Sequence, residues 1–390
     1  MKTRKWVKLQ PRKIQRKKLQ KGFTLVELMV GVAIALLTLL IITQVFATST
    51  HQNRQIAGSN DAQQTAAIIN YRIGNILRQA GSNLLLKSNA WGCGLQAAKD
   101  GNALLPGISW PGPFSVIPGH LRATPIVIWG ASTTPSSRDS DILLALGGNG
   151  GTSAVFSATP DATNHQFSVE NSNGVLPADY LLMANSKVAG ADCYLFKVSS
   201  DFALFHEDGR LKDTPQAVPL DTRFMVEDSL TAMPGKTSLL NLGNSPKLYM
   251  IGVHPEKITL ELYDFLQNQN IETTGSAVTL GENVFLLRAL YGVADSDTGD
   301  LAWQSPAASG WTFNELQAGT QAANDGLSRI KAIRIALVMR ATFPSGDLSP
   351  ASIQLFHSLE NSLRQTVVLT DAERRYRYQV YETVVPLFNL

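Results

Sequence analysis

The sequence predicts an α+β protein: a long N-terminal α-helix, membrane-spanning in its first half and amphipathic in its second half, packed on a β-rich, mainly antiparallel globular head. Three observations support this fold class. No proline interrupts residues 23–79, the apolar positions of that stretch change from continuous to one-sided, and short alternating runs follow Gly81. The predicted regions are a basic leader at 1–22, the helix at 23–80 and the head at 81–390.

The leader concentrates the positive charge of the chain. Residues 1–22 hold ten of the 34 Lys and Arg residues and no acidic residue, which leaves 24 basic against 31 acidic residues, a net of −7, in the remainder. Such an arm could bind nucleic acid. However, positive residues beside an apolar helix stay cytoplasmic, so the leader more simply orients the chain and sends the head into the periplasm.

One carboxylate lies at the start of the apolar run. Residues 28–50 contain no charged side chain, and Glu27 directly precedes them. A lone Glu at membrane depth costs at least a few kcal/mol, so it is expected to serve a function and to have a partner. If the chain is cut after Gly22, Phe23 becomes a cationic N-terminus one helical turn from Glu27.

The run Gly22-Phe23-Thr24-Leu25-Val26-Glu27, followed by about 20 apolar residues, resembles the type III signal of type IV pilins and type II secretion pseudopilins. The resemblance implies that a prepilin peptidase cuts after Gly22 on the cytoplasmic side and methylates Phe23. It also implies that Glu27 is a contact of assembly and not of the fold, and that it neutralises an N-terminal ammonium, most simply that of an adjacent subunit.

Two other interpretations of this segment remain open. A secretory signal peptide also begins basic and continues apolar, and Val45-Phe46-Ala47 could serve as a cleavage site that leaves Thr48 first. A plain membrane anchor has the required length. The apolar run is about twice the length of a usual signal core, and neither interpretation explains the motif that ends at Glu27.

The helix is predicted to continue beyond the membrane as an amphipathic helix. Its apolar positions recur mostly at three- and four-residue steps, and Gly81 is a plausible end signal. The stripe consists of Ile56, Ala62, Ala66, Ile69, Ile73 and Leu77. These residues are expected to pack against the sheet of the head.

The head is predicted to consist of short strands between turns, with a proline-rich loop at 104–125. Strict alternation over 330–339 places Ile333, Ile335, Leu337 and Met339 on one face, as in a half-buried strand. Residues 351–364 suggest a short helix and residues 324–326 a turn. The predicted strands are Ile126–Trp129, Ile142–Leu146, Tyr180–Met183, Tyr194–Val198, Lys247–Val253, Ile258–Tyr263, Val284–Tyr291, Ile330–Met339 and Tyr376–Val385.

Four short segments of the head resemble the PilW-like minor pilins. They are Ser140-Asp141-Ile142-Leu143, Ala191-Asp192-Cys193, Leu290-Tyr291-Gly292-Val293 before acidic residues, and the terminal 376–386 with its Tyr-Arg-Tyr and Tyr-Glu-Thr-Val-Val-Pro pieces. Each segment is weak alone, and their order along the chain carries the resemblance. J-type pseudopilins share this architecture but usually have smaller heads.

The two cysteines, Cys93 and Cys193, both follow the predicted membrane segment. An even number of cysteines in an oxidising compartment favours one disulfide. Two separate buried thiols are the alternative. Neither cysteine has a second Cys or a His at metal-ligand spacing.

Alternating acidic residues at Asp295, Asp297 and Asp300 are the best candidates for a calcium site, because Ca²⁺ needs several oxygen ligands close together. The spacing departs from an EF-hand, and a solvated acidic turn is the simpler interpretation. The basic and aromatic residues at 374–378 could suggest nucleic-acid binding. Strand alternation instead places the tyrosines opposite Arg375 and Arg377, so nucleic acid is not an expected partner.

The sequence therefore predicts a minor type IV pilin and not an enzyme. Its six His residues are scattered, and it has no Gly-x-Ser-x-Gly elbow or P-loop. The expected partners are the major pilin, other minor pilins, the prepilin peptidase, the inner-membrane assembly platform and a large tip adhesin; calcium is the one candidate cofactor. The expected location is the inner membrane and then the pilus. The alternatives are a J-type pseudopilin of a type II secretion system and a membrane-anchored periplasmic enzyme or binding module.

Overall fold

The computed structural model describes residues 22, 24–84, 90–107, 109–149, 155–185, 188, 190–203, 216–233, 235, 237–266, 277–294, 300–345 and 347–389. The chain forms two compact units, Met1–Ile56 and Ala57–Leu390, and each is described by itself. Among these residues an N-terminal helix precedes a β-rich head, so the predicted fold class is confirmed.

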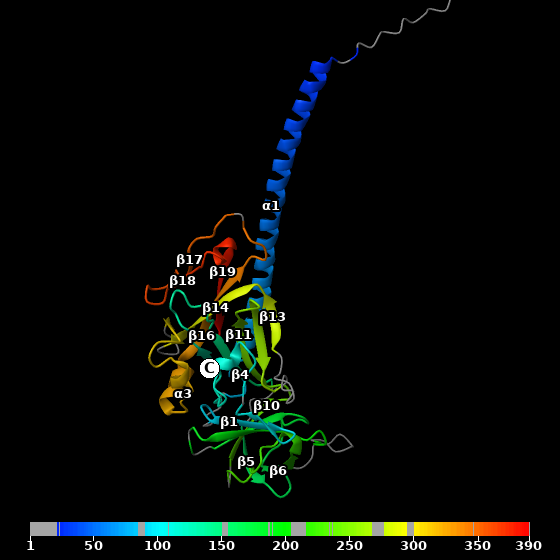
Figure 1. Cartoon of the computed structure of the whole chain (residues 1–390). Helices are drawn as coiled ribbons and strands as arrows, with labels where there is room; N and C mark the ends of the chain where they lie inside the picture. The colour runs from blue at the N-terminus through cyan, green and yellow to red at the C-terminus, as the bar shows by residue number, and fades with distance from the viewer. Residues whose placement is uncertain are drawn as a thin grey trace, which may run out of the picture. The chain divides into compact units, whose positions relative to one another are not determined.

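The N-terminal helix α1 covers Leu25–Arg78, 54 residues, and forms one continuous ribbon (Figure 1). The absence of proline permits this length, which corresponds to about 80 Å at 1.5 Å per residue. The predicted end signal is also observed. Gly81 has a φ of +78°, a value that glycine adopts without strain, and its N–H donates to the carbonyl of Leu146 at 2.8 Å.

The second half of α1 is amphipathic as predicted. Five members of the apolar stripe (Ala62, Ala66, Ile69, Ile73 and Leu77) are buried in the largest hydrophobic cluster of the head. The side chain of the sixth member, Ile56, lies outside the described part of the chain. The helix approaches one strand closely, because a Cβ added at Gly281 would lie 2.4 Å from Cδ1 of Ile69. Glycine at this position therefore lets the stripe pack on the sheet.

Nineteen strands form four sheets in the described part of the chain. Every pairing is antiparallel except that of β1 with β8. The largest sheet has eight strands in the order β2-β1-β8-β7-β10-β5-β6-β9. Its strands are β1 (Gly94–Lys99), β2 (Asn102–Leu105), β5 (Val155–Asp161), β6 (Gln166–Val169), β7 (Tyr180–Ala184), β8 (Asp192–Lys197), β9 (Gln216–Pro219) and β10 (Thr237–Gly243).

The other three sheets complete the head. The five-stranded sheet has the order β13-β12-β11-β4-β3, the four-stranded sheet has the order β15-β14-β16-β19, and β17 pairs with β18. Their bounds are β3 (Ile126–Trp129), β4 (Ile142–Gly147), β11 (Lys247–His254), β12 (Thr259–Asp264), β13 (Val278–Glu282), β14 (Val284–Ala294), β15 (Leu301–Gln304), β16 (Ile330–Arg340), β17 (Ser352–Leu355), β18 (Gln365–Val368) and β19 (Tyr378–Pro386). The short helices are α2 (Phe313–Leu316), α3 (Gln321–Arg329), η1 (Phe114–Val116), η2 (Thr222–Phe224) and η3 (Glu373–Arg375).

The eight-stranded sheet closes on itself through its last strand. An antiparallel bridge joins Val198 to Leu220, and the N–H of Asp221 donates to the carbonyl of Lys197 at 2.8 Å. Strands β8, β7, β10, β5, β6 and β9 therefore form a small barrel. Its interior is a separate hydrophobic cluster that includes Phe167 and Phe196, whose rings contact edge to face with centroids 5.2 Å apart. The opposite faces of β7, β8 and β10 belong to the main core.

Strand β16 corrects one prediction. The predicted face of Ile333, Ile335, Leu337 and Met339 does pack in the main core. The opposite face is not solvated, because Ala336 and Val338 are buried in a third cluster with residues of the β17–β18 hairpin and β14. The strand is therefore buried on both faces and not half-buried.

All nine predicted strands are present, with end shifts of one or a few residues. Two local predictions were wrong. Residues 351–364 contain strand β17 and turns instead of a helix. Residues 324–326 lie inside α3, because Thr320 caps that helix through the N–H of Ala323 and because Ala323 and Leu327 are buried. The loop at 104–125 is broken only by the end of β2 and by η1.

Candidate functional site: the N-terminal segment and the motif residues of the head

The predicted processing site lies just before α1. Gly22 is exposed, and Phe23 lies outside the described residues, as does the leader 1–21. The first described hydrogen bond of the helix ladder runs from the N–H of Leu28 to the carbonyl of Thr24 at 3.1 Å. Gly22 is therefore exposed and lies outside the helix.

Glu27 and Thr24 cap the start of α1 reciprocally. The Thr24 Oγ accepts from the N–H of Glu27 at 3.2 Å, and the Glu27 carboxylate accepts from the N–H and the hydroxyl of Thr24, each at 3.1 Å. This arrangement is a capping box, which satisfies N–H groups that a helix start leaves unpaired. Glu27 thus makes one contact within its own chain, the capping box with Thr24. The contact with another subunit that the resemblance implies would be additional.

The helix segment Leu25–Thr50 is long and apolar enough to cross a membrane, with a mean hydropathy of 2.8, and none of it is buried inside the protein. At 1.5 Å per residue its 26 residues exceed the hydrocarbon thickness of about 30 Å. Glu27 lies within this segment and is exposed. Its carboxylate therefore has no cation nearby among the described residues.

Cys93 and Cys193 are joined in the structure, with their sulfur atoms 2.01 Å apart. Cys93 directly precedes β1, and Cys193 lies in β8 opposite Leu95 in the parallel pairing. Both residues are buried. The bond ties the start of the head to the barrel, 100 residues later in the chain.

The predicted calcium ligands are only partly described. Asp295 and Asp297 lie outside the described residues, and Asp300 is exposed before β15. Within the described ranges no group of three His, Cys, Asp or Glu side chains is placed to hold a metal ion. Calcium at this loop remains a prediction.

Two of the residues at 374–377, Arg374 and Tyr376, form local contacts. Arg374 donates to the carbonyl of Ser349 at 3.0 Å, and its guanidinium lies 3.7 Å from Asp371. The ring of Tyr376 lies under the guanidinium of Arg340, 4.5 Å from its centroid. Arg340 therefore occupies one face of this ring.

Sequence reasoning missed the partner of Asp141. The side chains of Asp141, just before β4, and Arg288, on β14, are 3% and 2% exposed and form an ion pair of 3.1 Å. Asp141 also accepts from the N–H groups of Ala131 and Ala289, each at 2.8 Å, and Arg288 donates to the carbonyl of Ser132. Complete burial raises the pKa of Asp141, against the opposing effects of Arg288 and the two N–H groups.

Other motif residues also join the sheets. The hydroxyl of Tyr291 on β14 accepts from the N–H of Ile128 on β3 at 2.6 Å, and burial raises the pKa of this tyrosine. Glu382 on β19 accepts from Arg334 at 2.6 Å and from the N–H of Phe356 at 2.7 Å. The motif segments of the head therefore act as structural ties and present no catalytic arrangement among the described residues.

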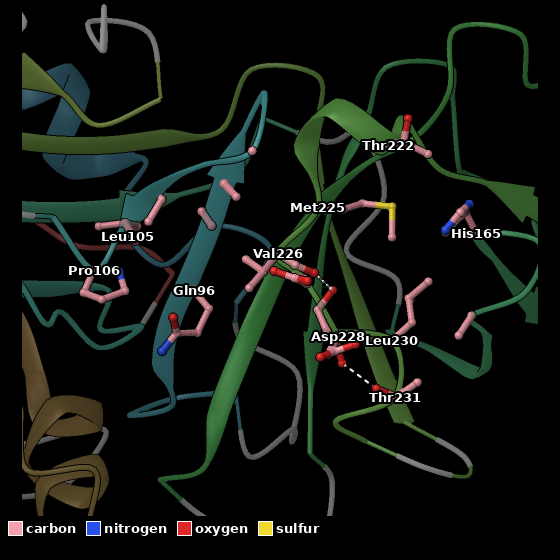
Figure 2. A pocket seen from close by; sticks show the side chains of 17 residues that line it. Gln96, Leu105, Pro106, His165, Thr222, Met225, Val226, Asp228, Leu230 and Thr231 are labelled. Carbon is pink, nitrogen blue, oxygen red and sulfur yellow. Dashed lines mark hydrogen bonds between the residues drawn. The ribbon is translucent and has the colours of Figure 1, made fainter. Parts of the chain in front are cut away.

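A pocket of about 690 Å³ opens beside the barrel (Figure 2). Gln96 of β1, Leu105 of β2 and residues 225–231 line it, with His165 on the far side. The lining hydroxyls of Ser229 and Thr231 already donate to carbonyls of their own turn. The pocket combines small apolar side chains with two carboxylates and shows no nucleophile–base pair in the described part.

The fold and the N-terminal segment are typical of pilin-like proteins: a membrane-competent helix with a Glu near its start, continued by an amphipathic half that packs on a β-rich head. The family model of the prokaryotic N-terminal methylation motif matches residues 17–43. The model of the type IV pilus-assembly protein W matches residues 245–389. The N-terminal segment is therefore similar to that of prepilin-like proteins, and the C-terminal part of the head is similar to the type IV pilus-assembly protein W. No curated protein and no solved structure matches it.

Proposed function

We propose that this chain is a minor pilin, incorporated in few copies at the pilus tip, where it helps to start assembly. The observation that carries the proposal is the N-terminal segment, in which Gly22 precedes a helix whose Glu27 lies in an exposed apolar span. A membrane span that serves only as an anchor needs no carboxylate at that depth. Glu27 therefore serves assembly, as the cation of a neighbouring N-terminus would neutralise it.

The size of the head supports a location at the pilus tip. The unit that begins at Ala57 contains 334 of the 390 residues, and its strands build three large sheets and a hairpin. In a filament shaft the helices pack side by side, so every head must fit beside its neighbours. A head of this size would crowd such a ring, whereas at the tip nothing packs above it.

The proposal includes the route and the partners. The prepilin peptidase cuts after Gly22 and methylates Phe23. The protein waits in the inner membrane with its head in the periplasm. The assembly platform then inserts it with other minor pilins beneath a tip adhesin and above the major pilin. No chemistry on a substrate is proposed; the work of this protein is assembly.

Absolute quantification of sheared pili by mass spectrometry tests this proposal. The chain should be present far below the major pilin, and its deletion should reduce the number of pili much more than their diameter. Copy numbers near those of the major pilin would contradict the tip location. Co-purification with secretion pseudopilins instead of pilus subunits would favour the J-type alternative.

A further inference from the structure

Strand β19 forms a long free edge of the four-stranded sheet. It pairs with β16 on one side over nine residue pairs without a shift in register. The sheet order β15-β14-β16-β19 places no strand on its other side. All residues from Tyr378 to Val384 are at least partly exposed, and Val384 is 46% exposed.

The phase of the pairing identifies the outward backbone groups. The N–H of Leu387 donates to the carbonyl of Lys331, and the N–H of Ala341 donates to the carbonyl of Arg377. Between Arg377 and Leu387, every second residue of β19 therefore directs its N–H and C=O groups toward β16. In an antiparallel pair the intervening residues point their N–H and C=O groups away from the partner. Those of Val380, Glu382 and Val384 have no hydrogen-bond partner in the described part of the chain.

Other sheet edges of the head are short or occupied. Strands β2, β3 and β15 have four residues each, and the edge strand β9 is bridged to β8. Strand β13 has five residues, its pairing is interrupted by a shift in register, and Arg72 donates to its Leu280 carbonyl. These are the devices that prevent edge-to-edge association. Among the described edges, β19 alone combines nine residues with unbroken pairing.

The charge on β19 does not protect its edge. Its one charged residue, Glu382, is bonded to Arg334 and to the N–H of Phe356. Arg375 and Arg377 lie exposed just before the strand, and neither forms an ion pair with the described residues. A strand that runs antiparallel to β19 ends beside these two arginines. The basic pair therefore favours an occupant with an acidic C-terminal end.

We infer that β19 is a docking edge that accepts an extended segment of another pilus protein, antiparallel to β19, with apolar residues in alternation and acidic residues at its end. The designation of the partner as a pilus protein rests on the proposed function. The main-chain hydrogen bonds would supply affinity, and the flanking side chains specificity. The leader 1–22 is excluded by its positive charge, and a second β19 would bring no free carboxylate to Arg375 and Arg377.

A synthetic nine-residue peptide of alternating threonine and valine that ends in two glutamates tests the edge directly. The protein is the purified full chain in detergent, and the readouts are fluorescence anisotropy and amide hydrogen exchange. The peptide should bind and should slow exchange at Val380, Glu382 and Val384. A peptide that ends in two lysines should bind roughly tenfold more weakly, because it meets Arg375 and Arg377 with like charge.

Substitutions of one residue separate the edge from the fold. Val384→Pro removes an outward N–H and leaves the bonds to β16 intact, so the unfolding midpoint should be unchanged while peptide binding weakens roughly tenfold or more. Val384→Thr keeps the N–H and should bind within about twofold of the original chain. Thr383→Pro removes a bond to β16 and should lower the unfolding midpoint.

Three results would overturn the inference: equal binding by Val384→Pro, no protection of the outward amides by saturating peptide, or a dimer of the full chain that Val384→Pro abolishes. The last result would identify a second copy as the occupant. If the peptide does not bind while the chain still enters pili, the docking edge is refuted and the proposed function is not. Absence of the chain from sheared pili would refute the proposed function and leave the peptide result standing.

Discussion

The exposed N-terminal segment and the head each contain a carboxylate in apolar surroundings, but the two carboxylates differ in their partners. Glu27 lies in an apolar span, and among the described residues its carboxylate bonds only to Thr24, whereas Asp141 in the head is buried against Arg288 and two N–H groups. A carboxylate in apolar surroundings requires a partner in both cases. The head supplies that partner from its own chain, whereas the described residues of the N-terminal segment supply no cation for Glu27. Asp141 therefore serves the fold, whereas Glu27, on the proposed function, also serves assembly.

The head itself divides along the family match. Residues 245–389, which the PilW model covers, form β11–β19, including the four-stranded sheet with Tyr291 and Glu382. The barrel strands β5–β10 precede this range and have their own hydrophobic cluster. The part that resembles the family thus contains the free edge of β19. The barrel, like β1–β4, lies outside the range that the family model matches.

The largest effect is expected from Glu27→Gln. Glutamine can keep the capping box but carries no charge to pair with an ammonium, so its amount in sheared pili should fall at least tenfold, corresponding to about 1.4 kcal/mol or more. Thr24→Ala is the matched control, because it removes the cap and keeps the charge. It should cost about 1 kcal/mol of local helix stability and leave incorporation largely intact.

Quantitative immunoblots of membranes and sheared pili check this prediction. Both variants should be present in membranes at normal levels with folded heads. If Glu27→Gln enters pili normally while Thr24→Ala does not, Glu27 acts only as a cap, and the contrast with Asp141 fails.

The next effect concerns the buried pair of the head. Arg288→Ala leaves Asp141 buried without its cation and should lower the free energy of unfolding by about 3–5 kcal/mol. The double variant Asp141→Asn/Arg288→Met removes both charges and should cost less than the single variant. Chemical denaturation followed by tryptophan fluorescence measures both. A loss under about 1 kcal/mol for Arg288→Ala would show that the pair behaves as a surface pair.

The disulfide should contribute slightly less. Replacing Cys93 and Cys193 by alanine should lower the free energy of unfolding by about 2–4 kcal/mol, because the bond closes a loop of about 100 residues. Non-reducing mass mapping of periplasmic protein establishes the bond itself. Two free thiols in that material would contradict it, and either result leaves the assembly role of Glu27 untouched.

The smallest effect is expected at Glu373, which forms a two-pronged contact of 2.6 Å with Arg138. Burial acts to raise the pKa of Glu373, but hydrogen bonds from Arg138 and Thr370 outweigh it, so the pKa lies below its ordinary value. A lowered pKa contributes stability above the unfolded-state pKa of about 4.5, which is lost as the pH falls through the folded-state value.

Glu373→Gln should therefore cost about 1 kcal/mol at pH 7 and almost nothing in strong acid. Unfolding curves of both proteins across this pH range measure the difference. A difference that stays constant with pH would show that the charge of Glu373 is not responsible. Ser137→Ala, at an exposed turn beside Arg138, provides a control with little expected effect.

Long or strongly periodic elements could be predicted from the sequence. The stripe from Ala62 to Leu77 was sufficient because burial on one face sets its period. The alternation in β16 was sufficient to predict a strand, although both faces of that strand are buried. The barrel strands β6 and β9 were missed, since four residues such as Gln166–Val169 carry too little period. The predicted helix at 351–364 failed because tertiary burial of Leu355 and Phe356 in the third cluster outweighs local helix propensity.

The site was predictable only where its signal is local. Gly22, Phe23 and Glu27 are neighbours in sequence, and a short motif identifies them. Asp141 and Arg288 are 147 residues apart, and only the fold brings them together. One signal was present: Arg288 is a lone charge in the apolar strand 284–291, and the reasoning applied to Glu27 would have predicted a buried partner for it as well.

The mature N-terminus tests the central claim most directly. Intact-mass and N-terminal peptide analysis of the chain from membranes should show a protein that begins at Phe23 and carries one methyl group on its terminal nitrogen. A protein that begins at Thr48 would indicate a secretory signal, and an uncut chain that retains residues 1–22 would indicate a plain anchor. Either result would contradict the assignment of this chain to pilus assembly.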